Sequence, residues 1–296
     1  MNSKINAEDS FENYFSNLYG KRWKNIYDNL RIDAGKIARI NRFCGNVSIN
    51  ETVKNFTPFT HLKECYISDN YSEIPICKNG LKAFYLMDPA SIIPVINLDI
   101  KKGESVLDMC AAPGGKSLII AEILNGTGSL TLNDISRKRI FKMKKILDDY
   151  LPNEILSKII IKNLNGTDIF FRKKSSYDKI LLDAPCSAER HLLKKNGMEK
   201  EWKISGTKRV AIKQYSLISS ALLSLKPTGK LVYSTCSLSE FENDKIIEKL
   251  LKRHNDEIEI ESVNSFLGEA TKHGWIILPE KNPFGPIYFS VIRKKK

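Results

Sequence analysis

The chain has 296 residues, of which 42% are hydrophobic, and this is enough for one large domain or two with a sizeable core. Its net charge of +13 favours a polyanionic partner, most often nucleic acid, although a composition biased towards Lys, Asn and Ile would also give a basic chain. No apolar run approaches the roughly 20 residues that cross a bilayer, and no secretory signal is visible, so we expect neither a membrane-spanning nor a secreted protein.

The first hundred residues are predicted to be helical at first and irregular afterwards. Aromatic and aliphatic residues recur at spacings of three and four between residues 11 and 43, which predicts helices that pack on a main domain. Prolines interrupt residues 44–100, where a short helix is expected near 91–97. We therefore divide the chain into an N-terminal helical arm or extension, residues 1–80, and a main domain, residues 81–296.

From residue 105 onward, strand and helix patterns alternate. After a first strand that ends at residue 107, strands are predicted at 128–133, 158–162, 177–183, 230–235, 275–278 and 287–292. Helices are predicted from residue 116, at 137–150 with Ser136 as N-cap, at 209–225, and after a capping box at 239–242. Residues 187–207 are predicted to be a polar loop. The alternation predicts an α/β fold whose largely parallel sheet is covered by helices on both faces.

The turn after the first strand is the centre of the predicted site. Asp108 stands where this strand leaves the core, and Pro113, Gly114 and Gly115 form a turn before the helix at Lys116. Ligands of open α/β sheets bind at the carboxyl ends of strands, where glycines allow close approach and helix N-termini offer free N–H groups. The spacing of a phosphate-binding P-loop is missing. A glycine turn can also be a plain start of a helix, so this turn alone does not identify a ligand.

Polar residues also end the next strands of the predicted sheet. Asp134 ends the second strand, where a carboxylate typically binds the ribose of a nucleoside cofactor, although it could be a solvated side chain. Asn165 and Gly166 follow the third strand, and Asp183 ends the fourth. We expect these residues to line one cleft. The cofactor would be a dinucleotide or S-adenosylmethionine, and the absence of a G-x-G-x-x-G spacing favours S-adenosylmethionine.

Two cysteines follow neighbouring strands of this sheet. Cys186 comes after the fourth strand and Cys236 after the fifth. An isolated cysteine is usually a core residue, but two at matching positions beside a cofactor cleft indicate chemistry. A thiolate that adds to C6 of cytosine makes C5 nucleophilic enough to accept a methyl group, while Asp183 can hold the ring at N3 and N4. The dipole of the helix expected after Cys236 would favour a thiolate there, yet these residues alone do not decide which cysteine attacks.

The six cysteines contain no C-x-x-C pair and no tight framework. We therefore expect reduced thiols in an intracellular compartment. The four histidines are scattered without the spacing of metal ligands, so no metal site is expected.

Several short motifs together resemble the Nop/Sun family of RNA cytosine-5 methyltransferases. They are LDMCAAPGGK at 107–116, Asp134 with Arg139, DAPC at 183–186, STCS at 234–237 and Glu242 with Asn243. They stand in the family's order, and the likeness covers about residues 80–296. The resemblance implies a Rossmann-like S-adenosylmethionine-dependent methyltransferase sheet with an antiparallel last strand. Residues 81–296 would then be the catalytic domain.

The resemblance also implies roles for the matching positions on the cofactor side. The cofactor loop would comprise Cys110, Ala111, Ala112, Pro113, Gly114, Gly115 and Lys116, with Lys116 also near the target base. Asp134 would bind the ribose and Arg139 would lie close to the adenosine. Close relatives have an acidic residue where this chain has Asn165 before Gly166. Asn165 would make a neutral contact with the adenine edge, or Asp168 would supply the carboxylate.

On the substrate side, the family resemblance assigns the two cysteines different roles. Cys236 would be the nucleophile that attacks the cytosine, and Cys186 would assist release of the product. Asp183 would sit between the cofactor and the cytosine. DNA cytosine methyltransferases attack with the cysteine at the position of Cys186, so this assignment comes from the family alone.

The opening residues 11–42 and the closing residues 278–289 resemble the short mitochondrial branch of the family most. That branch methylates ribosomal or transfer RNA and lacks the added RNA-binding domain of several relatives. Its ribosomal member works with a helical-repeat partner of the mTERF type. The resemblance thus implies a mitochondrial location and a substrate that is ribosomal RNA or, alternatively, transfer RNA. It does not decide whether this chain needs an mTERF-type partner.

The segment 187–213 is predicted to lie over the RNA beside Cys186. Its basic residues would track phosphates and Trp202 would stack on an unpaired base; these basic residues are Arg190, His191, Lys194, Lys195, Lys200, Lys203, Lys208, Arg209 and Lys213. A solvated basic loop is the alternative. Two rival functions are methylation of an amino group, which usually uses an Asn/Asp-Pro-Pro-aromatic motif after the fourth strand, and non-catalytic RNA binding in ribosome assembly.

Overall fold

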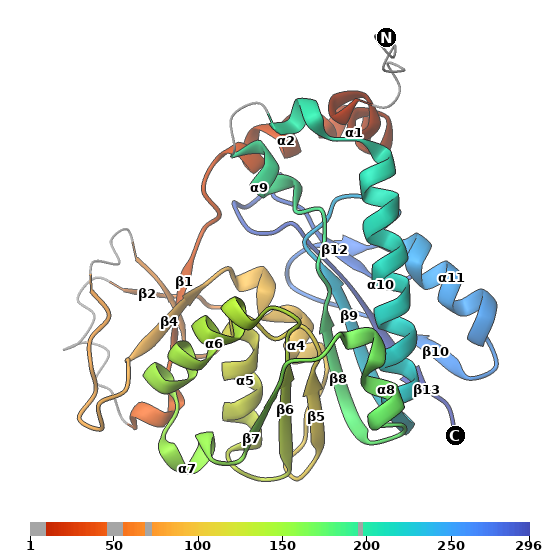
Figure 1. Ribbon diagram of the computed structural model, residues 1–296. Helices are drawn as coiled ribbons and strands as arrows, with labels where there is room; N and C mark the ends of the chain where they lie inside the picture. Colours follow the sequence, from red (N-terminus) through yellow and green to blue (C-terminus); the bar gives the residue numbers. More distant parts are fainter. Residues whose placement is uncertain (1–9, 46–55, 69–72, 195–197) are drawn as a thin grey trace.

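The computed structural model describes residues 10–45, 56–68, 73–194 and 198–296, and its centre is one large sheet (Figure 1). The strand order is β11-β12-β13-β9-β8-β5-β6-β7, and β10 pairs with β13 outside this path. The parallel strands are β5 (Ser105–Asp108), β6 (Ser129–Asn133), β7 (Ile159–Lys162), β8 (Tyr177–Asp183) and β9 (Leu225–Thr235). The antiparallel strands are β10 (Ile258–Glu261), β11 (Glu269–Ala270), β12 (Trp275–Ile277) and β13 (Ile287–Lys294). The predicted α/β fold is confirmed, as is an antiparallel last strand, β13, beside β9.

Helices cover both faces of this sheet, as predicted (Figure 1). One face carries α4 (Ile93–Asn97), α5 (Gly115–Leu124), α6 (Arg137–Tyr150) and α7 (Asn153–Leu156); the other carries α8 (Ile169–Arg172), α10 (Ile204–Ser224) and α11 (Asp244–His254). Side chains alternate between the faces along each strand, so Val106 joins the first core cluster and Leu107 the second. Ser136 caps α6 as predicted. In the described ranges, every helix is too short or too polar to span a lipid bilayer.

The N-terminal region is helical only at its start. Helices α1 (Phe11–Tyr19) and α2 (Trp23–Arg31), joined by the 3-10 turn η2 (Gly20–Arg22), agree with the prediction. The predicted helix over residues 11–43 is wrong beyond them, because β1 (Ile37–Ile40) is a strand. It belongs to a small antiparallel sheet, ordered β2-β3-β1-β4, with β2 (Thr57–Pro58), β3 (Cys65–Ile67) and β4 (Phe84–Met87). All residues of β1 are buried between its two neighbours, so tertiary pairing outweighs the local periodicity.

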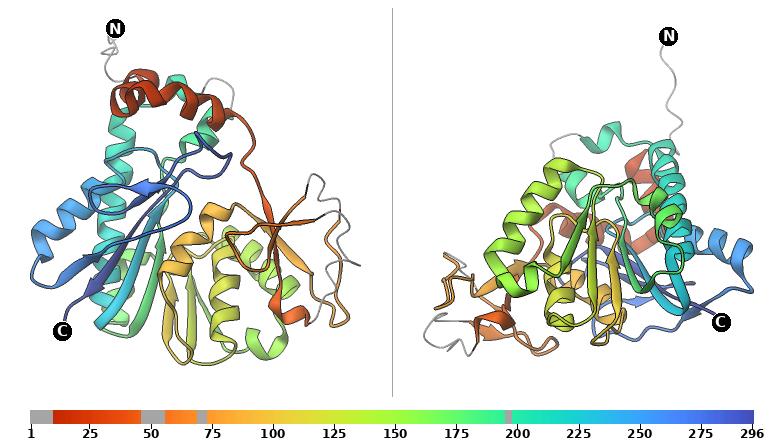
Figure 2. Two further views of the ribbon diagram at one scale, coloured as in Figure 1. Left: turned by 180° about the vertical axis from the view of Figure 1, so that it is seen from behind. Right: turned by 60° about the horizontal axis from the view of Figure 1, so that its bottom comes forward.

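The small sheet lies beside the main one, next to α5 and α6 (Figure 2). Its strand β4 follows residue 80, whereas β1, β2 and β3 precede it. The short helix expected near residues 91–97 is present as α4 after the 3-10 turn η4 (Pro89–Ser91). The domain boundary at residue 80 stays a prediction. The first nine residues of the predicted N-terminal arm lie outside the described part of the chain.

Three local predictions after β8 are wrong. The expected polar loop at 187–207 contains α9 (Glu189–Leu193), the 3-10 turn η6 (Met198–Glu201) and the first turn of α10. The capping box at 239–242 does not open a helix, because α11 begins at Asp244 and the Glu242 carboxyl turns inward to Ser187 and Gln214. Strand β9 begins at residue 225 instead of 230, because it pairs with β8 on both sides of a register shift.

Helices α1 and α2 pack at the end of the sheet where α9 lies (Figures 1 and 2). The rings of Phe11 and Phe15 contact Trp202 with centroid separations of 5.7 and 5.5 Å. The Tyr19 hydroxyl donates to the carbonyl of Leu238 at 2.7 Å. The N-terminal helices therefore support the segment that follows Cys236.

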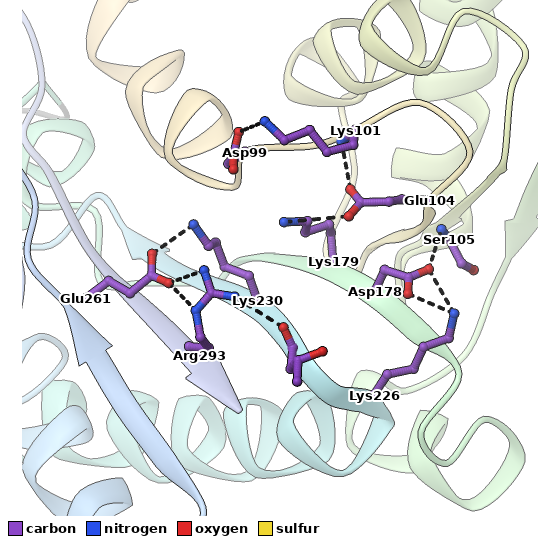
Figure 3. Close-up of polar contacts among 11 residues, drawn as sticks. Asp99, Lys101, Glu104, Ser105, Asp178, Lys179, Lys226, Lys230, Glu261 and Arg293 are labelled. Carbon is purple, nitrogen blue, oxygen red and sulfur yellow. Dashed lines mark hydrogen bonds and ion pairs between the residues drawn. The ribbon is translucent and has the colours of Figure 1, made fainter. Parts of the chain in front are cut away.

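At the opposite end of the parallel strands, lysines pair with carboxylates (Figure 3). Lys226 Nζ lies 2.8 Å from Asp178 Oδ2, at the start of β8. Lys230 Nζ, which is buried, lies 2.8 Å from Glu261 Oε2, and the Arg293 guanidinium binds the same carboxylate. These ion pairs join β8, β9, β10 and β13 at the end of the sheet opposite to the carboxyl ends of β8 and β9, which the two cysteines follow.

Candidate functional site

The loop at 110–116 joins β5 to α5 and forms the floor of the site. Gly114 has φ of +112°, in the left-handed region that favours glycine. A Cβ on Gly115 would lie 2.8 Å from the Tyr85 ring, so a larger residue would collide with this side chain from β4. The glycine turn therefore has a packing reason here, and Tyr85 covers the predicted cofactor loop.

A cleft of about 320 Å³ opens over this loop. Its lining combines the loop with the ends of β5 and β8 and with the N-terminal region: Ala34, Gly35, Lys36, Tyr85, Leu86, Met87, Asp88, Ser91, Asp108, Cys110, Ala111, Ala112, Pro113, Gly115, Lys116 and Asp183. The expected cleft at the carboxyl ends of the strands is therefore present. The residues from 34–36 and 85–91 were not predicted to line it.

Asp108 is buried at the end of β5 and accepts a hydrogen bond from Ser117 Oγ at 2.7 Å. Burial raises the pKa of Asp108 to about 7. Its other carboxyl oxygen has no hydrogen-bond partner among the residues that the structure describes. The carboxyl can therefore hold a proton near neutral pH at the base of the cleft.

Asp134 and Arg139 lie beside the loop but do not contribute to the lining of the cleft, so the expectation that Asp134 lines it together with Asp183 is wrong. The Asp134 carboxylate accepts a hydrogen bond from the Ser136 N–H at 2.9 Å and lies 3.0 Å from Arg139 Nη1. The guanidinium of Arg139 also binds the carbonyl of Ala112, within the loop. Asp134 is buried although Arg139 is half-exposed, so the ion pair fixes a carboxylate at the end of β6.

Asn165 and Gly166 follow β7 but do not contribute to the lining of the cleft over the loop. The exposed Asn165 side chain accepts a hydrogen bond from the Thr167 N–H at 3.3 Å. Gly166 is buried, and a Cβ there would lie 2.6 Å from Leu217. Asp168 is exposed and accepts a hydrogen bond from the Thr167 hydroxyl. A contact of either Asn165 or Asp168 with an adenosine stays a prediction.

Asp183 occupies the centre of the site, at the end of β8. Lys116 Nζ donates to its Oδ2 at 2.7 Å, and Ser234 Oγ donates to its Oδ1 at 2.8 Å. The carboxylate is thus oriented by neighbours from the loop and from β9. Because it also lines the cleft, it can accept further hydrogen bonds from a ligand.

Cys186 and Cys236 meet beside this carboxylate. The expectation that strands four and five are neighbours is confirmed, since β8 and β9 pair in parallel up to Asp183, which lies opposite Ser234. The two cysteines form a disulfide, as do Cys44 and Cys77, so the expectation of reduced thiols is wrong for the structure. The spacing of the cysteines along the chain does not indicate these disulfides. Cys186 and Cys236 meet because the ends of two neighbouring strands bring them together. Both catalytic candidates are half-buried.

A second cleft of about 260 Å³ opens at Cys236 and shares Ala34, Asp88 and Ser91 with the first. Its other lining residues are Ala188, Arg190, His191, Lys194, Gly285, Pro286 and Ile287. The Nε and Nη2 atoms of Arg190 are buried there without a hydrogen-bond partner in the described part of the chain. Burial lowers the pKa of Arg190, and a ligand with acceptor atoms would complete its hydrogen bonds.

The basic segment 187–213 divides into parts with different environments. Trp202 is 8% exposed and packs among the rings of α1, so the expected stacking of Trp202 on an RNA base is wrong. Lys194 pairs with Asp33. Besides Lys194, the exposed basic residues in the described part of the segment are His191, Lys200, Lys203, Lys208, Arg209 and Lys213. Lys195 lies outside the described residues, and contact of this segment with RNA stays a prediction.

Sequence reasoning missed Tyr85, Asp88 and Glu189 in this region. Asp88 caps η4 through Ala90 N–H and accepts a hydrogen bond from Gly285 N–H at 2.8 Å, so it joins two distant segments at the site. Only the Asp-Pro pair at 88–89 gave a local signal, since it is typical of a turn. Tyr85 and Glu189 depend on long-range packing and have no local signature.

Comparisons with known proteins agree with this geometry. The family model described as 16S rRNA methyltransferase RsmB/F matches residues 95–293. The mouse mitochondrial tRNA (cytosine(34)-C(5))-methyltransferase is 31% identical over 245 residues, which cover 78% of this chain and 70% of the mouse protein. Mouse 5-cytosine rRNA methyltransferase NSUN4 is 32% identical over 236 residues, which cover 73% of this chain and 61% of NSUN4.

A solved structure gives the same result. The methyltransferase homologue from Pyrococcus horikoshii superposes with a TM-score of 0.76 at 25% identity, over 95% of this chain and 93% of that one. The predicted Rossmann-like methyltransferase fold, the resemblance to the Nop/Sun family and the dependence on S-adenosylmethionine are confirmed. The chain belongs to the RsmB/F family of S-adenosylmethionine-dependent RNA methyltransferases, whose relatives named above are cytosine-5 enzymes.

Proposed function

We propose that this protein methylates C5 of a cytosine in RNA through a covalent bond between Cys236 and C6 of the base. The observation that carries the proposal is the contact between Cys186 and Cys236 after two neighbouring strands, with the Lys116–Asp183 pair at the end of β8. Lys116 and Asp183 line the first cleft, and Cys236 lines the second. A nucleophile, a second thiol and a carboxylate are the groups that this chemistry requires. The thiols become available when a dithiol reductant opens the disulfide between them.

The first cleft fits the cofactor. Its glycine turn allows close approach of a ligand to the backbone. Asp134 lies beside the cleft at the end of β6, where a carboxylate typically binds a ribose, although it is buried against Ser136 and Arg139. Residues 110–116, Asp134 and Arg139 would hold the cofactor, with Asn165 and Gly166 at the adenine end. S-adenosylmethionine supplies an electrophilic methyl group on a sulfonium. Asp183, at the border of the cleft, separates this group from the base.

On the substrate side, the thiolate of Cys236 forms a bond with C6 of the cytosine, and the electron pair of the C5–C6 double bond moves towards C5. Asp183, held by Lys116 and Ser234, orients the ring through N3 and N4. C5 then bonds to the methyl carbon as the carbon–sulfonium bond breaks. The C5 proton passes to the thiolate of Cys186, the C5–C6 double bond forms again, and the bond between C6 and sulfur breaks to release the thiolate of Cys236. Cys186 assists this last step.

The second cleft and the exposed lysines of α10 support RNA as the substrate. Arg190 presents unpartnered N–H groups beside Cys236, which suit the oxygens of a nucleotide. The target base would be flipped out or single-stranded, since chemistry at C5 and C6 needs access to the ring. We propose mitochondrial ribosomal RNA, with mitochondrial transfer RNA as the second candidate, because relatives of both kinds match the chain. An mTERF-type helical-repeat protein would be the partner in the ribosomal case.

The test is transfer of labelled methyl groups from S-adenosylmethionine to total mitochondrial RNA by the reduced protein. Wild type should place the label in 5-methylcytosine, and Cys236→Ala should abolish it because the bond to C6 cannot form. Cys186→Ala should accumulate a protein–RNA adduct that survives a denaturing gel. The labelled RNA, ribosomal or transfer, identifies the substrate.

Cys65→Ala is the matched control, since Cys65 is a buried thiol in β3 of the small sheet. It should retain methyl transfer if the protein folds. An adduct that is lost with Cys186→Ala but kept with Cys236→Ala would reverse the two cysteine roles. No methylation by wild type, with a ribosomal fraction and the helical-repeat protein present, would favour non-catalytic RNA binding.

A further inference from the structure

Two serines and two glutamates form a cluster directly behind the cysteines. Ser187 and Ser237 each stand one residue after a cysteine, and their Oγ atoms lie 3.1 Å apart. Both hydroxyls also contact Oε1 of Glu189 and Oε1 of Glu242; the distances from Ser237 are 3.0 and 3.1 Å. Both glutamates are fully buried, with 0% exposure. We call these four residues the serine–glutamate cluster.

The second oxygen of each carboxyl crosses to the opposite loop. Oε2 of Glu189, which follows the first cysteine, accepts a hydrogen bond from the Leu238 N–H at 3.1 Å. Oε2 of Glu242, which follows the second cysteine, accepts hydrogen bonds from the Ser187 N–H at 3.1 Å and from Gln214 Nε2 at 2.7 Å. Each glutamate therefore holds the loop that carries the other cysteine.

The cluster lacks enough hydrogens when both carboxyls are ionised. Its hydroxyls have one hydrogen each, and Ser237 Oγ already accepts the N–H of Ser239 at 3.0 Å. Two hydroxyl hydrogens cannot fill the oxygen contacts between the serines and both carboxyls. One proton on a carboxyl supplies the missing donor and removes the repulsion between two buried charges. Burial first, and then the charge of Glu242, raises the pKa of Glu189 to about 7.

The phenol groups that surround the cluster carry no charge near pH 7. Tyr14 and Tyr19 face it from α1 and Tyr233 faces it from β9. Burial raises the pKa of each phenol, so all three are neutral near pH 7. Glu240 lies nearby and pairs with Lys245 at 2.5 Å. The glutamates are thus surrounded by hydroxyl, amide and phenol groups.

We propose that the serine–glutamate cluster shares one proton between Glu189 and Glu242, and that this proton keeps the loops of Cys186 and Cys236 at their working separation. The two glutamates are positioning residues, since they act through the backbone and the serines. Loss of the proton leaves two buried anions that repel each other and separate the loops. The inference rests on the proposed function in one respect, because that function needs both thiols at the same base.

The test measures how closely the thiols are held, without RNA or S-adenosylmethionine. The protein is equilibrated with reduced and oxidised glutathione between pH 6 and pH 8, and the Cys186–Cys236 disulfide is quantified by peptide mass spectrometry. The equilibrium constant gives the effective concentration of one thiol at the other. For wild type we expect this concentration to fall about tenfold by pH 8, because a carboxyl with a pKa near 7 is then about nine-tenths ionised.

Glu189→Gln removes one of the two charges and keeps the shape, so its effective concentration should not change with pH. Glu242→Gln should behave in the same way and serves if the first variant does not fold. Glu261→Gln, at the far end of the sheet, is the control and should follow the wild-type curve. Wild-type behaviour in both cluster variants, or a flat wild-type curve, would overturn the proposal.

Methyl transfer provides an independent readout. If the proposed function holds, the alkaline decline of kcat in wild type should be absent from Glu189→Gln. If wild type makes no 5-methylcytosine while the thiol equilibrium changes with pH as expected, the proposed function fails and the shared proton stands.

Discussion

Carboxyl groups at the two ends of the parallel strands have pKa values that are shifted in opposite directions. At the start of the strands, Asp178 and Glu261 face lysine and arginine side chains (Figure 3). Burial alone would raise the pKa of Asp178, but hydrogen bonds from Lys226 and from the Ser105 N–H outweigh it, and the pKa lies below its usual range. At the other end, burial raises the pKa values of Asp108 and Glu189 to about 7.

This difference separates structural from chemical carboxyls. Ion pairs at the start of the strands balance charge and join neighbouring strands. At the carboxyl ends, hydroxyl and amide groups surround Asp108 and Glu189. Asp134 and Asp183 face the cations Arg139 and Lys116, and Asp183 also lines an open cleft. A protein can keep protons and reactive groups at one end of a sheet when ion pairs at the other end balance the charges there.

The sharpest test of this comparison uses two aspartates on the same strand. Asp183→Asn should lower kcat for methyl transfer by about 10²–10⁴-fold, because the base loses the carboxylate that orients its ring. Asp178→Asn, at the start of β8, should leave kcat within about twofold, since it changes contacts with Lys226 and the Ser105 N–H that lie far from the cleft. Equal losses in kcat per folded molecule would contradict the distinction between the two ends.

The next effect concerns stability. Glu261→Gln should lower the free energy of unfolding by about 1–3 kcal/mol, because the buried Lys230 ammonium loses its charged partner. Denaturant titration of the reduced protein measures this change. Glu154→Gln, the same change at an exposed residue of α7, gives the size of an ordinary surface substitution. A Glu261→Gln variant as stable as wild type would show that the ion pairs of Glu261 contribute nothing.

The smallest effect per pH unit is the pH dependence of stability, and the two ends give it opposite signs. Asp178 and Glu261 have lowered pKa values, so their stabilisation is present above the unfolded pKa and is lost as the pH falls. Asp108 and Glu189 have raised pKa values, so the folded state binds their protons more tightly and stability decreases as the pH rises from about 4 to about 7. Each proton contributes at most about 1.4 kcal/mol per pH unit.

Glu189→Gln should therefore flatten the decrease between pH 5 and about pH 7 without changing the acid side. Asp178→Asn should do the reverse. Urea unfolding curves collected from about pH 3 to about pH 7 provide both slopes. An unchanged slope in both variants would mean that neither end is coupled to folding through these protons.

The central sheet was predictable from the sequence because its signals are local. A buried apolar run such as 180–182, closed by Asp183, identifies both a strand and a polar strand end. The chemistry-bearing residues stand at those ends, so the cleft over residues 110–116 and the meeting of the two cysteines followed from the order of strands. The parallel topology then brings these residues together, since it places the carboxyl ends of the strands at one edge of the sheet.

The failures have a common physical cause, which is dependence on distant partners. Ile37 and Ile40 have helical spacing relative to α2, yet β3 and β4 make them a strand. Trp202 reads as an exposed aromatic among lysines, whereas α1 buries it. Glu242 fits a capping box, but two hydroxyls and Gln214 from other elements hold it inward. No local pattern reveals a partner that lies more than twenty residues away.

The contact of α1 with the segment after Cys236 also has a consequence in time. The Tyr14 hydroxyl bonds Ser239 Oγ at a separation of 225 residues, and Tyr19 bonds Leu238 across 219 residues. During synthesis, the first helix must therefore wait for most of the chain before it meets its partners. Contacts of such long range slow folding, because the loop between them must close first. The reactive cysteine segment is among the last parts of the molecule to be secured, so a nascent chain gains its completed active site only near the end of translation.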